Sequence, residues 1–128
     1  METEFVMDSS AVLALVYQEP GQEHVSAALP GARISSVNLT EVISKLLDRG
    51  LSLDQVDDQM TDLSLVVIDF DRDLAIQAGV LRSATRPRGL SLGDRACLAL
   101  AMREKLPVMT ADKAWCDLDL PVEVVLIR

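Results

Sequence analysis

Residues 91–101 read Ser-Leu-Gly-Asp-Arg-Ala-Cys-Leu-Ala-Leu-Ala and predict a helix that is apolar around most of its circumference. Such a helix belongs in the core of a domain. Asp94 is the one carboxylate in this stretch, and it lies in the first helical turn. Ser91 followed three positions later by Asp94 matches a capping box, in which each side chain bonds the backbone amide of the other residue. Asp94 is therefore either a capping group or an acid held at the mouth of a cleft.

Short apolar runs and helical patterns alternate on both sides of this stretch. Apolar residues that recur every three or four positions predict helices, and short apolar runs bounded by polar residues predict strands. The predicted strands are residues 5–7, 33–35, 65–68, 107–110 and 122–127, and the helical patterns cover 12–17, 25–29, 39–47, 53–63, 74–81 and 91–101. The alternation predicts an α/β fold, a single-domain three-layer α/β/α sandwich whose mainly parallel sheet is covered on both faces.

Composition narrows the possible functions. The 128 residues are 49% hydrophobic, which is ample for the core of one domain. The net charge of -8 is opposite in sign to that of a protein with a broad basic face for nucleic acid. Any nucleic-acid partner must then be held by local basic patches or bound cations. The two cysteines have no metal-site spacing, and no signal peptide or membrane span is found, so the chain is expected to be cytoplasmic.

Four acids are expected at one edge of the predicted sheet. Asp8 follows the first strand and Asp112 the fourth, while Glu41 and Asp94 lie near the starts of helices that follow loops on the same side. Ligands of such sheets collect beyond the carboxyl ends of the strands. Carboxylate oxygens are preferred ligands of Mg²⁺ and Mn²⁺. Two such ions can clamp a phosphodiester while one activates water.

Each of these acids also has a purely structural explanation. Asp8 and Asp112 are acceptable N-caps, and Asp94 fits the capping box. Glu41 precedes Lys45 by four residues, the favourable order for an ion pair within a helix. Both roles can coexist, because a carboxylate oriented by backbone amides still has a second oxygen for a metal. A further acidic run is most simply a solvated helix face, comprising Asp54, Asp57, Asp58 and Asp62.

The four acids lie in blocks that resemble the motifs of the PIN domain family. The blocks are VMDSSA at 6–11, SVNLTEV at 36–42, LGDRACLALA at 92–101 and VMTADKAW at 108–115. Their order and spacing cover nearly the whole chain, and the strongest resemblance is to the VapC-type toxin branch. The resemblance implies one PIN-like nuclease domain over residues 1–128. It also implies a Mg²⁺- or Mn²⁺-dependent endoribonuclease, the toxin of a type II toxin–antitoxin pair, that leaves 5′-phosphate and 3′-hydroxyl ends.

The resemblance also implies roles for individual residues. The family's four metal-binding and catalytic carboxylate positions are matched by Asp8, Glu41, Asp94 and Asp112. Thr110 matches a small hydroxyl position beside the last acid, and Asn38 and Ser9 match polar positions near the site. Asp117 is either the extra acid of some members or the cap of a turn. The implied partners are an RNA substrate, a VapB-like antitoxin and a second copy of the chain.

Electrostatics shapes both the expected site and the expected binding of RNA. Carboxylates that share a small cleft repel one another, so at least one should hold a proton in the metal-free protein. Candidate contacts to the RNA backbone are Arg82, Arg86, Arg88 and Arg95. The first three equally fit a basic helix end that complements the helix dipole. Aromatic residues are too few for stacking on several bases.

Three other functions fit the sequence less well. His24 is the only histidine, which excludes a mechanism that uses a pair of histidines. A response-regulator receiver expects an acidic pair after the first strand, where Met7-Asp8-Ser9 supplies a single acid. A PIN-fold module that binds RNA or protein without cutting it would lack at least one of the four acids. None is missing, and this module is the remaining alternative.

Overall fold

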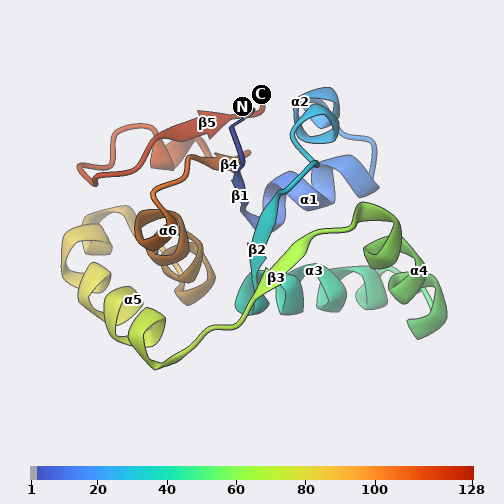
Figure 1. Cartoon of the computed structure of the whole chain (residues 1–128), viewed down its shortest axis with the longest axis horizontal. Coiled ribbons are helices and arrows are strands. Elements are labelled where there is room, and N and C mark those ends of the chain that lie inside the picture. The colour runs from blue at the N-terminus through green and yellow to red at the C-terminus, as the bar shows by residue number, and fades with distance from the viewer. Residues whose placement is uncertain (1–2) are drawn as a thin grey trace.

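A parallel sheet of five strands lies at the centre of the molecule (Figure 1). The structure is a computed structural model, and it describes residues 3–128. The strands are β1 (Val6–Met7), β2 (Arg33–Ser35), β3 (Val66–Ile68), β4 (Val108–Thr110) and β5 (Val124–Leu126). Their order is β3-β2-β1-β4-β5, and every neighbouring pair is parallel. This confirms the predicted α/β sheet. It also excludes a receiver-type sheet, whose order is 2-1-3-4-5.

Helices flank the sheet and bury two separate apolar clusters. The helices are α1 (Ser9–Val16), α2 (Gln22–Ala27), α3 (Ser36–Asp48), α4 (Leu53–Leu63), α5 (Arg72–Thr85) and α6 (Leu92–Glu104), with short 3₁₀ turns η1 (Arg86–Arg88) and η2 (Lys113–Trp115). Helices α1 to α4 form one cluster with Met7, Ile34 and Met109, and α5 and α6 form the other with Val6 and Val108. Successive strand residues point to opposite faces, which is why neighbours such as Val6 and Met7 belong to different clusters.

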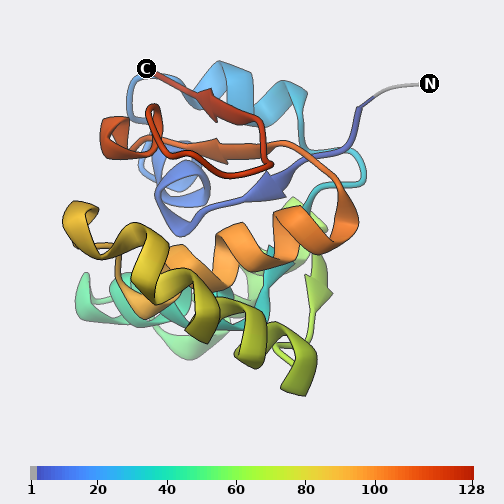
Figure 2. The same cartoon turned by 90° about the vertical axis from the view of Figure 1, so that its left-hand side faces the viewer.

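Helix α6 is the buried helix that residues 91–101 predict. It packs against α5 and against β1, β2 and β4, and Figure 2 shows it between α5 and the sheet. Residues 95–101 of this helix are all buried. A helix held on two sides is a rigid support for the acid in its first turn, because most of its side chains are fixed by close packing.

Strand β3 departs from the predicted sheet. The apolar run at 65–68 favours a strand covered on both faces, yet Val66 and Val67 are 46% and 44% exposed. Since β3 ends the strand order, it pairs only with β2. The prediction of complete coverage is therefore wrong at this edge of the sheet.

Several smaller predictions are confirmed. Cys97 is buried, Cys116 is exposed, and both are free. His24 lies on the surface in α2, and the four aspartates of α4 all face solvent.

Within residues 3–128, no helix combines the length and apolar character needed to cross a membrane.

Candidate active site

The two central strands bring Asp8 and Asp112 to the same edge of the sheet. Strands β1 and β4 pair in register, with Met7 opposite Met109, and the Asp8 amide donates to the Met109 carbonyl at 2.9 Å. The chain adds β2 and β3 on one side of β1 before returning to β4 on the other. The carboxyl ends of β1 and β4 thus form the topological switch point, where ligands of parallel α/β sheets bind.

Asp8 is buried at this point and held by two hydroxyl groups. It is 4% exposed, and its Oδ2 accepts hydrogen bonds from Ser10 Oγ at 2.6 Å and Thr110 Oγ1 at 2.8 Å. Asp8 occupies the N-cap position of α1, but its side chain makes no capping hydrogen bond. Capping therefore does not account for Asp8.

Burial raises the pKa of Asp8 to about 6. The hydrogen bonds from Ser10 and Thr110 lower this pKa, and the negative charges of Asp94 and Glu41 raise it further. Desolvation disfavours the charged form of a carboxyl group, and neighbouring negative charges act in the same direction. One acid of the group thus holds its proton more tightly than an ordinary carboxyl, although burial contributes more than repulsion.

The hydroxyl groups around Asp8 connect it to the last acid. Thr110 Oγ1 accepts from the Asp112 amide at 3.0 Å, and Ser10 Oγ accepts from the Ala111 amide at 2.9 Å. Thr110 thus lies between Asp8 and Asp112. Ser9, in contrast, makes no side-chain hydrogen bond within residues 3–128, and Ser10 takes the role expected of it. A serine two positions after an aspartate can bond back to that residue locally, and this was the signal available in the sequence.

Glu41 is fixed by Asn38 and by close contact with α6. Asn38 is fully buried, and its Nδ2 donates to Glu41 Oε1 at 2.9 Å and to the Gly93 carbonyl at 3.0 Å. A Cβ atom on Gly93 would lie 2.5 and 2.6 Å from the two carboxylate oxygens of Glu41. Gly93 is therefore a site residue that the sequence analysis missed. Its signal was a glycine inside a helix, which costs roughly 0.5–1 kcal/mol relative to alanine and so needs a reason.

Lys45 does not pair with Glu41. None of the ion pairs within residues 3–128 joins these two side chains, although the spacing favours one. The ion-pair explanation for Glu41 is thus not supported, and its carboxylate instead faces the start of α6.

Asp94 and Asp112 are both capping groups. Asp94 Oδ2 accepts from the Ser91 amide at 3.0 Å, and Ser91 Oγ accepts from the Asp94 amide at 3.1 Å, so the predicted capping box is confirmed. Asp112 Oδ1 accepts from the Ala114 amide at 2.9 Å and caps η2. Each cap uses a single oxygen of the carboxylate.

The four acids share one pattern: the protein fixes one oxygen and leaves the other without a hydrogen bond. Within the described part of the chain, the free oxygens are Asp8 Oδ1, Glu41 Oε2, Asp94 Oδ1 and Asp112 Oδ2. The buried Asn38 Oδ1 also has no partner there. Oxygen atoms of this kind are what hard divalent cations bind, so the donor set fits Mg²⁺ or Mn²⁺. In the present arrangement no three acidic, His or Cys side chains of residues 3–128 are close enough to share an ion, so binding would require the free oxygens to turn inward.

The remaining predicted residues lie elsewhere or are engaged. Asp117 is exposed, and its Oδ2 lies 2.7 Å from Arg88 Nη2 in an ion pair. Arg95 is buried, and its Nη1 donates to the Ala78 carbonyl at 2.8 Å, which corrects the prediction that it contacts RNA. Arg82 and Arg86 are exposed near the end of α5 and in η1.

A family model places this architecture among known proteins. Residues 5–120 match the model described as the PIN domain. No curated protein matches the sequence.

Three solved structures of toxin–antitoxin complexes contain similar chains. A chain of a Klebsiella pneumoniae toxin–antitoxin complex has a TM-score of 0.73 and 21% identity, covering 94% of this chain and 99% of its own length. A chain of Rickettsia felis VapBC2, bound to a DNA fragment from its promoter, has a TM-score of 0.74 and 17% identity over 97% and 98%. A chain of VapBC-5 from Mycobacterium tuberculosis has a TM-score of 0.63 and 22% identity over 99% of both. At these identities the likeness concerns the fold.

Proposed function

This chain belongs to the PIN domain family, and we propose that it is a Mg²⁺- or Mn²⁺-dependent endoribonuclease, the toxin of a VapBC-like toxin–antitoxin pair. One observation carries the proposal. Asp8 is buried at the switch point, the charges of Glu41 and Asp94 act on it, and Thr110 links it to Asp112, while each of these carboxylates keeps one oxygen free of hydrogen bonds within residues 3–128. Capping explains one oxygen of Asp94 and one of Asp112, but it does not explain the burial of Asp8.

The acids and their partners have distinct tasks in this proposal. Bound divalent cations would supply a water of lowered pKa and would balance the charge that develops on the phosphate. The chain's own residues hold the ligands in place. Ser10 and Thr110 fix Asp8, Asn38 fixes Glu41, and Ser91 fixes Asp94. Hydrogen bonds to metal ligands orient those ligands, and their removal changes metal affinity or activity by about 10–100-fold.

Burial of Asp8 makes cation binding dependent on pH. A carboxyl with a pKa of about 6 is largely protonated below that pH in the metal-free protein. Protons and cations then compete for the same oxygen atoms. Cation affinity is therefore expected to rise as the pH increases through 6.

The partners follow from the same proposal. Similar chains occur in complexes described as toxin–antitoxin or VapBC, which supports a VapB-like antitoxin as partner. A homodimer and a place in the cytoplasm are further parts of the proposal. The alternative is a PIN-fold module that binds RNA or protein without cutting it. The presence of all four acids argues against that alternative.

Cleavage of RNA by the purified protein tests the proposal. Wild-type protein is expected to cut RNA with Mg²⁺ or Mn²⁺ and to lose this activity in EDTA. Asp8→Asn should abolish cutting while the protein stays folded, whereas Asp62→Asn, which removes an exposed acid of α4, should cut at the wild-type rate. Folded Asp8→Asn that cuts normally would exclude the four-acid mechanism. A wild-type protein that neither cuts RNA nor gains thermal stability from divalent metal would favour the binding module.

A further inference from the structure

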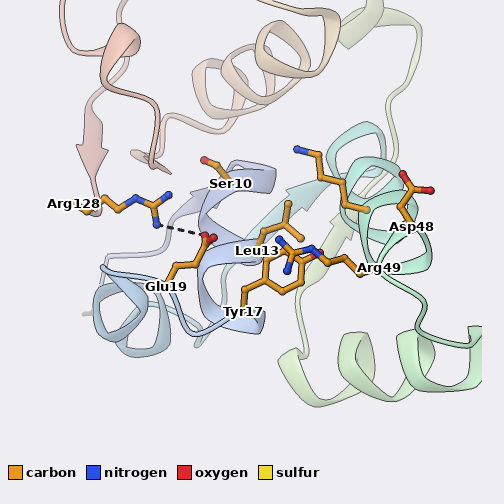
Figure 3. Close-up of a pocket in the computed structure, with 8 residues that line it drawn as sticks. Ser10, Leu13, Tyr17, Glu19, Asp48, Arg49 and Arg128 are labelled. Carbon is orange, nitrogen blue, oxygen red and sulfur yellow. Dashed lines mark hydrogen bonds and ion pairs between the residues drawn. The ribbon is translucent and has the colours of Figure 1, made fainter.

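A cavity of about 470 Å³ lies beside the acids, between α1 and α3 (Figure 3). Its lining comes from α1 and the residue after it (Ser10, Leu13 and Tyr17), from α3 and the residue after it (Lys45, Asp48 and Arg49), and from Glu19 and Arg128. Ser10 is the same residue whose hydroxyl binds Asp8. The cavity therefore begins where the acid site ends.

The cavity extends away from the acids along both helices. Ser10 and Tyr17 are seven residues apart on α1, so they lie on one face of that helix. On α3, Glu41, Lys45 and Arg49 follow one another at intervals of four residues and share a face in the same way. Lys45 lies about 6 Å and Arg49 about 12 Å along the helix axis from Glu41. A strand bound at the acids would pass these cations if it continued along the groove.

Positive charge in this cavity is only partly neutralised by the protein. Arg128 Nη1 is occupied by the Pro20 carbonyl at 3.0 Å and lies 3.5 Å from Glu19 Oε1. Lys45 and Arg49 take part in none of the ion pairs found within residues 3–128. The lining also includes the acids Glu19 and Asp48, so its three cations, Lys45, Arg49 and Arg128, leave one net positive charge. Local positive charge of this kind is what a chain of net charge -8 needs in order to hold a nucleic acid.

The Tyr17 hydroxyl, beside the cavity, is buried and also lacks a hydrogen-bond partner within residues 3–128. The guanidinium of Arg49 lies over the Tyr17 ring, 4.0 Å from its centroid, and Figure 3 shows the two side chains stacked. Buried hydroxyl groups normally have a partner. Because this one has no accessible surface, a ligand with acceptor oxygens would reach it only when a covering side chain such as Arg49 moves.

We propose that this cavity binds a backbone phosphate of the RNA strand, on the side of the cut site that α1 and α3 border. Lys45 and Arg49 supply the positive charge, and the Tyr17 hydroxyl donates a hydrogen bond to a phosphate or ribose oxygen. The inference rests on the proposed ribonuclease function and assigns its substrate-binding groove. Since one face of the Tyr17 ring is already covered by Arg49, the contact is with the backbone and carries no base preference.

The competing explanation is structural. Lys45 and Arg49 lie at the end of α3, where cations stabilise a helix through its dipole. Arg49 also gains a cation–π contact with Tyr17. In that case the two cations would have no effect on RNA.

Equilibrium binding of RNA separates the two explanations. The probe is a short fluorescent oligouridylate, titrated in EDTA over a range of salt concentrations and followed by anisotropy. Lys45→Ala should raise Kd several-fold and reduce the slope of log K against log salt by about 0.7, the value for one phosphate contact to a single strand. Arg72→Ala is the matched control. Arg72 is an exposed cation at the start of α5, next to the Asp71–Arg103 pair and thus at the end of α6 opposite to Asp94.

Tyr17→Phe provides the sharper variant. It removes only the unpaired hydroxyl, so a purely structural role predicts unchanged or higher thermal stability and unchanged RNA binding. The proposal predicts the same stability but weaker RNA binding.

The inference is overturned if Lys45→Ala and Tyr17→Phe both bind RNA with the wild-type Kd and salt slope. It is equally overturned if Arg72→Ala changes the slope as much as Lys45→Ala, or if the wild-type protein fails to bind at low salt. Because no divalent metal is present, binding can persist in a protein that does not cut RNA. Failure of this inference is thus distinguishable from failure of the ribonuclease assignment.

Discussion

Helices α4 and α6 both begin with a capping box, but they differ in how much of each helix is buried. In α4, Ser52 and Gln55 form a capping box with hydrogen bonds of 2.8 and 3.2 Å. In α6, Ser91 and Asp94 form a capping box with hydrogen bonds of 3.0 and 3.1 Å. Judged by these bonds alone, both boxes do the same work.

Their surroundings separate the two boxes. Helix α4 buries only Val56 and turns Gln55 to solvent, so its box stabilises a helix and nothing more. Helix α6 is buried along most of its length, and Asp94 is close enough to Asp8 for its charge to raise the pKa of Asp8. Under the proposed function, Asp94 is both a cap and a functional acid, because one carboxylate oxygen serves the helix and the other has no hydrogen bond within residues 3–128.

The largest expected effect is on RNA cleavage. Asp94→Asn keeps an oxygen that can accept from the Ser91 amide but removes the negative charge, so stability should change little. Activity should fall by about a thousandfold, because transition-state stabilisation by a metal site is worth several kcal/mol. Gln55→Glu adds a negative charge to the capping box of α4 and should leave activity unaltered. Rates of RNA cleavage and melting temperatures of both variants check this prediction, and equal effects on activity would contradict it.

The next effect concerns stability in the absence of metal. The pKa of Asp8, about 6 in the folded protein and 3.8 by the ordinary value, means that the folded state binds the proton more tightly. The contribution of Asp8 to stability is therefore greatest below about pH 4 and is lost as the pH rises toward 6. The full loss is at most about 3 kcal/mol.

Urea unfolding in EDTA between pH 4 and 7 measures this loss. Wild-type protein should lose stability relative to Asp8→Asn over that range, and Gln55→Glu should follow the wild-type curve. A constant difference between wild type and Asp8→Asn across the range would contradict the raised pKa.

The smallest effects on stability and cleavage are expected from replacing the two capping serines. Ser52→Ala and Ser91→Ala should each cost about 1 kcal/mol of stability, the usual value for a lost N-cap. Only Ser91→Ala should also slow RNA cleavage, by about 10-fold or more, since it loosens the turn that holds a proposed metal ligand. Chemical denaturation and cleavage rates of the two variants give the comparison. Equal cleavage by both would mean that Ser91 has no role beyond capping.

Much of the fold was predictable because its signals are local. The pattern at 91–101 predicts a buried helix, and the strands at 33–35 and 107–110 lie where the apolar runs place them. Coverage of the strand at 65–68 was not predictable, because an apolar run looks the same at the centre and at the edge of a sheet.

The site was predictable only in part. The four acids stand out as oxygen ligands after strands and at helix starts. Ser10 had a local signal, its place two residues after Asp8, whereas the space that Gly93 leaves for Glu41 exists only once α3 and α6 pack. Arg95 shows the reverse error. Its charge suggested a surface contact, but its place on α6 turns it toward α5, where it bonds the Ala78 carbonyl.

By itself, the sequence determined the helices, the strands and their caps, because propensity, hydrophobic periodicity and capping act over a few residues. Only the tertiary structure decided which capped carboxylate lies beside other acids. That outcome depends on strand order and helix packing, which join residues as distant as Asp8 and Thr110. Asp94 and Gln55 begin as equivalent caps, and the fold alone places Asp94 near Asp8 while Gln55 remains in solvent.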